Sequence, residues 1–203
     1  AAGARTLAIA LILSEPDRLS PEVLAKAYPD AAELSAFAQR SPGSNDQRLA
    51  TALAGLPVVL GVSAERDRKD APPPSKVSFA TAGDDPKPLL PHYAGATGPL
   101  PQLAEAAAAL GAVNWVPSGD QVVRRVPLLL TMGDTVYPSL ALEQYRLALG
   151  AQTLLVRASG ASGILAFGQK TGVDSLALGE RLIPASGNGE MWLHFAPLDR
   201  DRY

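Results

Sequence analysis

The sequence predicts an α/β fold with a mixed, partly parallel sheet flanked by helices, and with an antiparallel hairpin portion in the C-terminal half. In the first half, apolar runs of strand length alternate with segments of helical spacing, which is the pattern of parallel βαβ units. In the second half, short apolar runs follow one another across glycine-containing turns, which is typical of antiparallel strands. The length of 203 residues favours a single domain over residues 1–203.

The composition excludes several classes of function. Hydrophobic residues make up 47% of the chain, as in an ordinary folded protein, and the net charge of −2 lacks the basic excess of a nucleic-acid surface. The absence of cysteine excludes disulfides, thiolate catalysis and cysteine-ligated metals. No sequence motif for a phosphate loop, a dinucleotide or a zinc protease is present. We therefore expect no nucleic-acid partner, no metal and no cofactor.

The first elements alternate between strand and helix. Residues 6–13 form a continuous apolar run, which predicts a strand buried on both faces. A serine followed by proline predicts a helix over residues 20–39, with an interruption at Pro29. A second helix over residues 44–54 and a buried strand over residues 57–62 follow, so the two strands should be parallel.

Residues 65–101 are charged at first and then rich in proline and glycine. This composition predicts an irregular loop region with one strand at residues 76–81. Long irregular segments inside a domain tend to be lids or contact surfaces. His92 and Tyr93 lie in this region and are candidate ligand contacts, although an exposed histidine without a partner motif is usually only solvated.

The remaining elements follow in a regular order. An alanine-rich helix is predicted over residues 101–110, with Gly111 as its end. A strand, a turn, a second strand, a second turn and a helix are predicted after it, at residues 112–116, 117–120, 122–130, 132–134 and 138–150. Short strands are predicted at residues 153–156, 163–167, 175–178 and 182–184. A tight turn at residues 186–189 leads into a strand over residues 190–195, which predicts a hairpin.

Residues 61–65, Gly-Val-Ser-Ala-Glu, come close to the nucleophile elbow of hydrolases. Glu65 stands where that motif has its second glycine, the residue that allows the following helix to pack closely. A serine nucleophile at Ser63 would also need a histidine base, and the two histidines, His92 and His194, lie on unrelated segments. A hydrolase that acts through Ser63 is therefore the weaker alternative.

A hydrolase could instead act through acidic residues in the loops. Glu15 and Asp17 follow the first strand, at an edge where ligands often bind in α/β sheets, and Asp84 lies next to Asp85. Neighbouring acids form an acid–base couple only where their environments differ. A solvated turn is the more common use of such residues.

Arg124 and Arg125 are the stronger candidates for ligand binding. Consecutive residues of a strand point to opposite faces, so at most one of the two can face a pocket. A guanidinium there could bind a carboxylate through two hydrogen bonds. The more common alternative is an ion pair within the chain, with Asp120 or Glu143 as the partner.

The order of these pieces closely resembles the second type of CHASE domain, an extracellular sensory module of bacterial cyclases and histidine kinases. That family shows an ALGxVN strand, a Pro-Asp-x-Asp-Gly turn, a VVRRVPLL strand and a YPSLALE helix start. The corresponding segments here are residues 110–114, 117–121, 122–130 and 137–143. Residues 2–18, 45–61 and 178–195 are also similar to the family pattern, so the resemblance covers most of the chain.

Three departures accompany the resemblance. Ala10 stands where the family usually has an acid, Gln121 replaces a turn glycine, and residues 186–189 replace an Asp-Gly pattern. The first residues, AAGAR, are typical of the end of a helix. Together with the resemblance, they imply that the sensory domain is incomplete at both ends and that membrane helices and a cytoplasmic output domain lie outside this chain.

The resemblance implies an input domain on the periplasmic side of the cell membrane, with no catalytic activity of its own. It would bind an unknown small-molecule or environmental signal and regulate a nucleotide cyclase, a histidine kinase or a Ser/Thr kinase. It also allows a homodimer through the receptor. The candidate ligand-binding residues are Asn114, Arg124, Arg125, His92 and Tyr93, together with the loop region 65–101. Two alternatives stay open, the hydrolase described above and a domain that mainly dimerises and transmits force.

Overall fold

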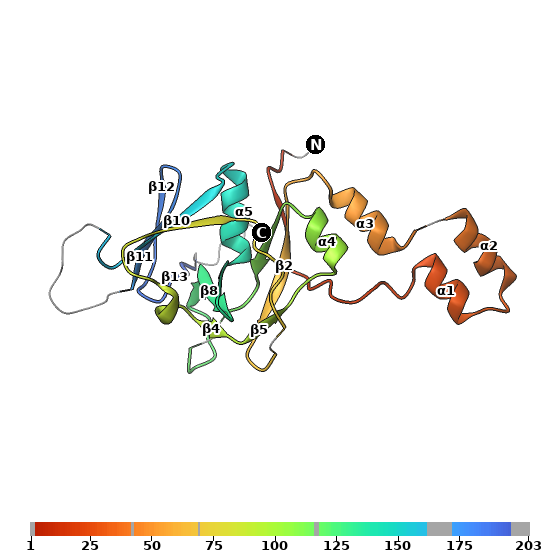
Figure 1. Cartoon of the computed structure of the whole chain (residues 1–203), viewed down its shortest axis with the longest axis horizontal. Helices are drawn as coiled ribbons and strands as arrows, with labels where there is room; N and C mark the ends of the chain where they lie inside the picture. Colours follow the sequence, from red (N-terminus) through yellow and green to blue (C-terminus); the bar gives the residue numbers. More distant parts are fainter. Residues whose placement is uncertain (1–2, 42, 69, 116–117, 162–171, 196–203) are drawn as a thin grey trace.

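The molecule consists of a mixed α/β body and a pair of short helices that projects from it (Figure 1). The computed structural model describes residues 3–41, 43–68, 70–115, 118–161 and 172–195. Within these residues, parallel and antiparallel strands pair in four small sheets, and antiparallel pairs dominate the C-terminal half. The predicted fold class is therefore confirmed.

Strand β2 (Val58–Glu65) is the centre of the first sheet. It pairs in parallel with β1 (Leu7–Ile9) and with β6 (Ala109–Ala112), which confirms the predicted parallel arrangement of the first two strands. The last residues of β2 pair antiparallel with β5 (Gly95–Thr97). Because its side chains are mostly apolar, β2 is buried along nearly its whole length and anchors the core.

The first strand is shorter and more exposed than predicted. β1 covers three residues, its Leu7 is 55% exposed, and Leu11 beyond its end is 64% exposed. The expectation of burial on both faces is therefore wrong. β1 lies at the edge of the sheet that the structure describes, with β2 as its neighbour on one side.

The alanine-rich helix ends earlier than predicted. Helix α4 (Pro101–Ala106) stops after six residues, and the chain then enters β6, with Gly111 inside that strand instead of at a helix end. A Cβ atom on Gly111 would lie 2.5 Å from the Cα of Leu140, so only glycine fits under the following helix. Packing thus overrides the helical propensity of alanine, which is a weak preference.

Residues 65–101 contain more regular structure than predicted. Strand β3 (Ser78–Ala82) agrees with the predicted strand, and β4 (His92–Tyr93), β5 and the short 3-10 helix η1 (Lys87–Leu89) also lie here. Tyr93 is 6% exposed and belongs to the core. Part of the region therefore supports the body, and residues 66–68 and 70–77 form its irregular portion.

The predicted strand over residues 122–130 is two strands with different partners. β7 (Arg125–Pro127) pairs antiparallel with β13 (Glu190–Trp192). β8 (Leu129–Met132) pairs with β4 and forms a hairpin with β9 (Thr135–Pro138), across the predicted second turn. Pro127, which has no N–H, ends β7 and marks the change of partner.

The second four-stranded sheet has the order β12-β11-β10-β3. β10 (Thr153–Ala158) lies parallel to β3, while β11 (Val173–Leu178) and β12 (Arg181–Pro184) continue the sheet antiparallel. These strands agree with the predicted ones, and the predicted strand at 163–167 lies outside the described residues.

The predicted C-terminal hairpin is wrong in its pairing. The tight turn forms as expected, because the N–H of Gly189 donates to the carbonyl of Ser186 at 2.7 Å. The strand that follows, β13, nevertheless pairs with β7, and β12 pairs with β11. A turn sets the direction of the chain, whereas the available sheet edge decides the partner.

Two helices begin at a serine side chain that caps them, whereas Ser20, at the start of the helix predicted over residues 20–39, makes no such bond. The hydroxyl of Ser44 accepts a hydrogen bond from Gln47 at the start of α3 (Asn45–Leu53), and Ser139 does the same for Leu142 at the start of α5 (Leu140–Ala148). The predicted interruption at Pro29 separates α1 (Pro21–Ala27) from α2 (Ala32–Arg40).

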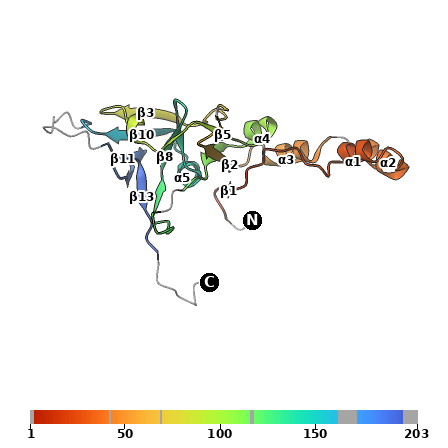
Figure 2. The ribbon, with the colours of Figure 1, turned by 90° about the horizontal axis from the view of Figure 1, so that it is seen from below.

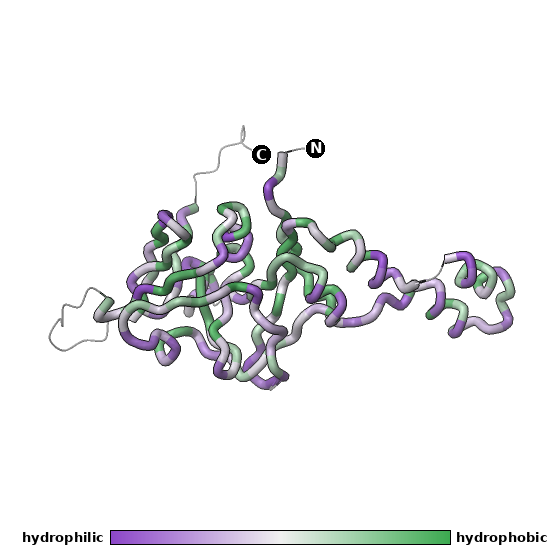
Figure 3. Tube along the Cα trace, turned by 45° about the horizontal axis from the view of Figure 1, so that its top comes forward, coloured by the Kyte–Doolittle hydropathy of each residue, from purple (hydrophilic) through white to green (hydrophobic). Residues whose placement is uncertain are grey.

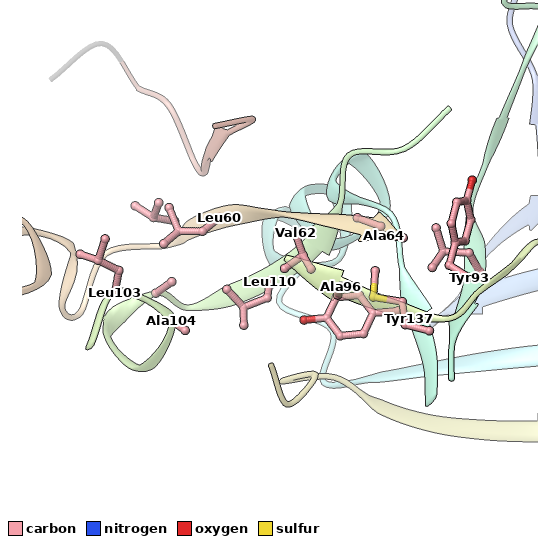
Figure 4. Packing of buried hydrophobic residues seen from close by; sticks show 14 of the residues in the cluster. Leu60, Val62, Ala64, Tyr93, Ala96, Leu103, Ala104, Leu110 and Tyr137 are labelled. Atoms are coloured by element: carbon pink, nitrogen blue, oxygen red, sulfur yellow. The ribbon is translucent and has the colours of Figure 1, made fainter. Parts of the chain in front are cut away.

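Two hydrophobic clusters hold the body together. The first joins β2, α4 and β6, and Figure 4 shows Leu60, Leu103 and Leu110 from these three elements within it. The second joins β10 and β11 to α5, with Leu154 and Leu176 at its centre. Figure 3 shows the same concentration of hydrophobic residues along the strands of the body.

Candidate ligand-binding site

A groove lies beside α4, between the loop that follows β2 and the end of β5. Its volume of about 660 Å³ is within the range of small-molecule sites. The walls are mainly apolar and come chiefly from the loop after β2, from β5 and from α4. They include Ala71, Pro73, Pro74, Ala96, Pro99 and Ala104.

Prolines and glycines shape the groove. Pro73 and Pro74 keep the loop extended along its wall, because proline restricts its own φ and the conformation of the residue before it. The loop lies directly on β5, where the N–H of Ala96 donates to the carbonyl of Asp70 at 2.9 Å. A Cβ atom on Gly95 would lie 2.5 Å from that same carbonyl oxygen, so a glycine is needed for this approach.

Charged groups of both signs stand at the rim. Nε of Arg68 donates to Asp70 at 2.8 Å, and its Nη1 donates to the hydroxyl of Thr97 at 3.1 Å. Nζ of Lys76 donates to the carbonyls of Glu105 and Ala107 at the end of α4. Burial lowers the pKa of Lys76, and the charge of Glu105 opposes this shift. Lys76 thus joins the loop to α4.

Tyr137 supports the groove from inside the body. Its hydroxyl donates to the carbonyl of Pro73 at 3.1 Å, and its ring lies in the core near Ala96 (Figure 4). Burial raises the pKa of this phenol, and the charge of Glu143 raises it further. The wall of the groove is therefore tied to a fully buried side chain.

Replacement of Tyr137 by phenylalanine is expected to lower the free energy of unfolding by about 1–2 kcal/mol at neutral pH, because the Pro73 carbonyl loses its donor. Above pH 10 the unfolded chain releases the phenol proton while the native chain keeps it. The native protein should therefore lose stability as the pH rises, and Tyr137→Phe should lose less. Urea unfolding at neutral and alkaline pH measures both effects, and equal losses in the two proteins would contradict the prediction.

Asn114 makes structural contacts with β2. Its side-chain oxygen accepts a hydrogen bond from the N–H of Ala64 at 2.7 Å, and its side-chain nitrogen donates to the carbonyl of Ala64 at 2.8 Å. These two bonds continue the pairing of the sheet beyond the end of β6. The amide therefore fixes the chain after β6, and it does not line the groove.

The two arginines both reach solvent and both have partners. Arg124 donates to both carboxylate oxygens of Asp120, at 2.8 and 2.6 Å, so the alternative of a local ion pair is confirmed for this residue. This pairing lowers the pKa of Asp120 to about 2. Arg125 lies 4.8 Å from the ring centre of Trp192, with Glu190 at 3.7 Å. Neither arginine lines the groove.

His92 and Tyr93 form β4 and diverge in their environments. Nδ1 of His92 lies 3.0 Å from the hydroxyl of Thr131, within hydrogen-bond distance, and the residue as a whole is exposed. Tyr93 is buried, with the guanidinium of Arg66 at 6.0 Å from its ring centre. The structure thus brings none of the five predicted ligand-binding residues into the groove, and their role stays a prediction.

The geometry around Ser63 does not form a nucleophile elbow. β2 continues through Ser63 to Glu65, and Ser63 pairs with Thr97 of β5. An elbow needs a sharp turn from strand to helix at the serine. The loop acids also have structural partners, since Glu15 pairs with Arg18 and Asp17 accepts a hydrogen bond from Asn45.

The groove lies partly within the predicted irregular region 65–101, but its charged lining residues were not among the predicted ones. Region 65–101 was predicted as a contact surface, and the loop over residues 70–76 does line the groove. Arg68, Asp70 and Lys76 were missed because no spacing joins them to one another or to Glu105. The run of three prolines that starts at Pro72 was the available signal, since it marks an extended wall.

In the described part of the chain, no helix reaches the length and hydrophobicity that crossing a bilayer requires. The described residues also contain no group of three or more histidine or acidic side chains that could hold a metal ion. No curated protein and no solved structure matches the chain significantly. The family model of the CHASE2 domain matches residues 1–203. The chain therefore belongs to the CHASE2 domain family, whose members are extracellular sensory domains of receptors.

Proposed function

We propose that this chain is the extracytoplasmic input domain of a bacterial transmembrane receptor and that it binds a small-molecule signal in the groove beside α4. The family match over residues 1–203 is the observation that carries the sensory role. Binding would regulate a cytoplasmic nucleotide cyclase, histidine kinase or Ser/Thr kinase. Membrane attachment would come from segments outside this chain, and the domain itself would carry no catalytic activity.

The chemistry of the groove favours a small organic molecule with an apolar body and a polar end. Proline and alanine side chains supply apolar walls, and such walls with a few polar groups are usual in ligand sites. The charges at the rim balance, with Arg68 and Lys76 against Asp70 and Glu105. A neutral polar molecule or a zwitterion therefore fits this site better than a polyanion.

A ligand in the groove could favour one arrangement of the loop and helix that form its walls. Its loop is tied to the core through Tyr137 and to the end of α4 through Lys76. A ligand that binds one arrangement of loop and helix more tightly shifts the population towards that arrangement. This difference in affinity would be the source of the signal.

Ala71→Trp tests the site, because Ala71 is exposed and lines the groove, where an indole would fill the space. The matched control is Ala52→Trp, on the exposed face of α3 and away from the groove. The measurement is the thermal midpoint of the purified chain with a panel of L-amino acids and small carboxylic acids. A compound that raises the midpoint of the native protein and the control should fail to raise that of Ala71→Trp.

The full-length receptor gives the second measurement. Its output activity should respond to the same compound in the native protein and in Ala52→Trp, and should lose the response in Ala71→Trp. An unchanged response or midpoint shift in Ala71→Trp would place the ligand elsewhere. The residues to replace next would then be Asn114, Arg124, Arg125, His92 and Tyr93.

A further inference from the structure

A separate pocket, called the η1 pocket below, lies where β3, β10, the turn between β8 and β9, and the start of η1 meet. β3 and β10 run side by side at its wall (Figure 2). Its volume of about 430 Å³ is within the range of small-molecule sites. The groove beside α4 leaves this pocket unexplained, because Ser75 is the one residue that lines both.

Core packing holds the apolar part of the η1 pocket in place. Phe79 and Thr81 are two positions apart on β3 and therefore share one face of the sheet, and Val156 of β10 lies opposite Thr81. Val136 of β9 adds to this lining. Val156 belongs to the second hydrophobic cluster, and Phe79 and Val136 pack against it while half-buried. An aromatic ring and two valines are thus available to the apolar body of a ligand.

Two exposed carboxylates stand at the mouth of the η1 pocket, Asp85 before η1 and Asp134 in the turn between β8 and β9. Asp85 accepts one hydrogen bond, from the N–H of Lys87 at 3.1 Å. Asp134 has no hydrogen bond or ion pair with any residue that the structure describes. Lys87 is the one base in the lining, so two negative charges and one positive charge leave a net charge of −1.

This combination selects a small organic ammonium ion. The net negative charge attracts a cation and repels an anion, and an aromatic ring such as that of Phe79 also attracts an ammonium group. Two carboxylates supply too few oxygen ligands for a metal ion such as Ca²⁺, and the described residues form no metal-binding group here. The apolar lining favours an ammonium ion that carries a hydrocarbon body.

The η1 pocket and the groove beside α4 share the loop over residues 70–76. Ser75 lines both cavities. The hydroxyl of Tyr137 in β9 donates to the carbonyl of Pro73 at 3.1 Å, and the preceding residue, Val136, lines the η1 pocket. The proline run over residues 72–74 is stiff, because each ring fixes its own φ. A molecule that displaces Ser75 should therefore displace the wall of the groove as well.

We propose that the η1 pocket binds a small organic ammonium ion with an apolar body, and that its binding moves the loop over residues 70–76. The ammonium group lies between Asp85 and Asp134, and the body lies against Phe79. This proposal goes beyond the function proposed above and does not depend on it, because binding of an amine can be measured without any ligand in the groove.

Isothermal titration calorimetry of the purified chain with three compounds of similar body tests the ligand class. The cation 2-phenylethylamine should bind with saturation, the neutral 2-phenylethanol should bind about fivefold more weakly, and the anion 3-phenylpropionate more weakly still. The double variant Asp85→Asn with Asp134→Asn should lose about tenfold in affinity for the amine. Asp84→Asn is the matched control, since Asp84 is an exposed neighbouring acid that does not line the pocket, and it should retain nearly the native affinity.

A fluorescent label tests the movement of the loop. The chain has no cysteine, so Ala71→Cys can be labelled at a single place with an environment-sensitive fluorophore. Saturation with 2-phenylethylamine should change the emission of this label and leave that of labelled Ala52→Cys, on the exposed face of α3, unchanged. Far-ultraviolet circular dichroism and the thermal midpoint check that each variant is folded.

Four results would overturn the proposal. They are the absence of saturable binding of 2-phenylethylamine, equal affinities for the three compounds, an unchanged affinity in the double aspartate variant, and an unchanged label at position 71 in a chain that binds the amine. Ala71→Trp separates this site from the groove, because it fills the groove and should still bind the amine. Loss of the amine in Ala71→Trp would place the amine in the groove instead.

Discussion

Arg146→Met is expected to lower the free energy of unfolding by about 3–5 kcal/mol, because it leaves a carboxylate buried without its partner. Glu143 is fully buried, and Arg146 donates to both of its carboxylate oxygens, at 2.7 and 2.8 Å. The same guanidinium donates to the carbonyl of Ala151 at 2.7 Å, so the end of α5 loses a bond as well. Urea unfolding of the two proteins measures the difference.

Two further variants show whether burial is the cause. Arg124→Met removes an ion pair of similar geometry at the surface, so it should change the unfolding midpoint very little. The double variant Glu143→Leu with Arg146→Met should recover much of the loss, because no charge remains buried. A loss in Arg146→Met no larger than that in Arg124→Met would contradict the role given to this buried pair.

Gly111→Ala is expected to cost about 3 kcal/mol of unfolding free energy, at the upper end of the usual penalty for overpacking. The added Cβ would lie 2.5 Å from the Cα of Leu140 and 2.7 Å from its nitrogen, so it meets backbone that cannot rotate away. The start of α5 would have to move off β6, together with the cap at Ser139.

Gly119→Ala is the matched control for this prediction. Gly119 also lacks a positive φ, and a Cβ there would meet no atom within 4 Å. Its substitution should change the unfolding free energy by less than about 0.5 kcal/mol, as is usual at exposed positions. Similar unfolding midpoints for the two variants would show that α5 does not rest on Gly111.

The sequence determined the elements that depend on local signals. Helices α3 and α5 begin close to the predicted starts at residues 44 and 138, because the capping hydroxyls of Ser44 and Ser139 act on residues two or three positions away. The turn at Gly133 also depends on neighbouring residues only. The order of segments that resembles the CHASE pattern can likewise be seen in the sequence without any knowledge of long-range contacts. The family and the fold class could therefore be predicted before any contact was known.

Only the tertiary structure decided which strands pair with one another. The run over residues 106–109 has the composition of a helix, but it enters β6 because β2 offers a parallel edge and Gly111 admits α5. β13 leaves its turn and pairs with β7, a choice that no local pattern encodes.

The groove also combines a feature that is visible in the sequence with contacts that only the fold creates. Its proline run was visible in the sequence, but Arg68, Lys76 and Glu105 come together only where the loop lies on β5 and against α4. Contacts between distant residues depend on which surfaces are left to be covered once the core has formed. Local propensity carries no information about those surfaces, and so the sequence predicted the kind of domain while the fold decided where a ligand could bind.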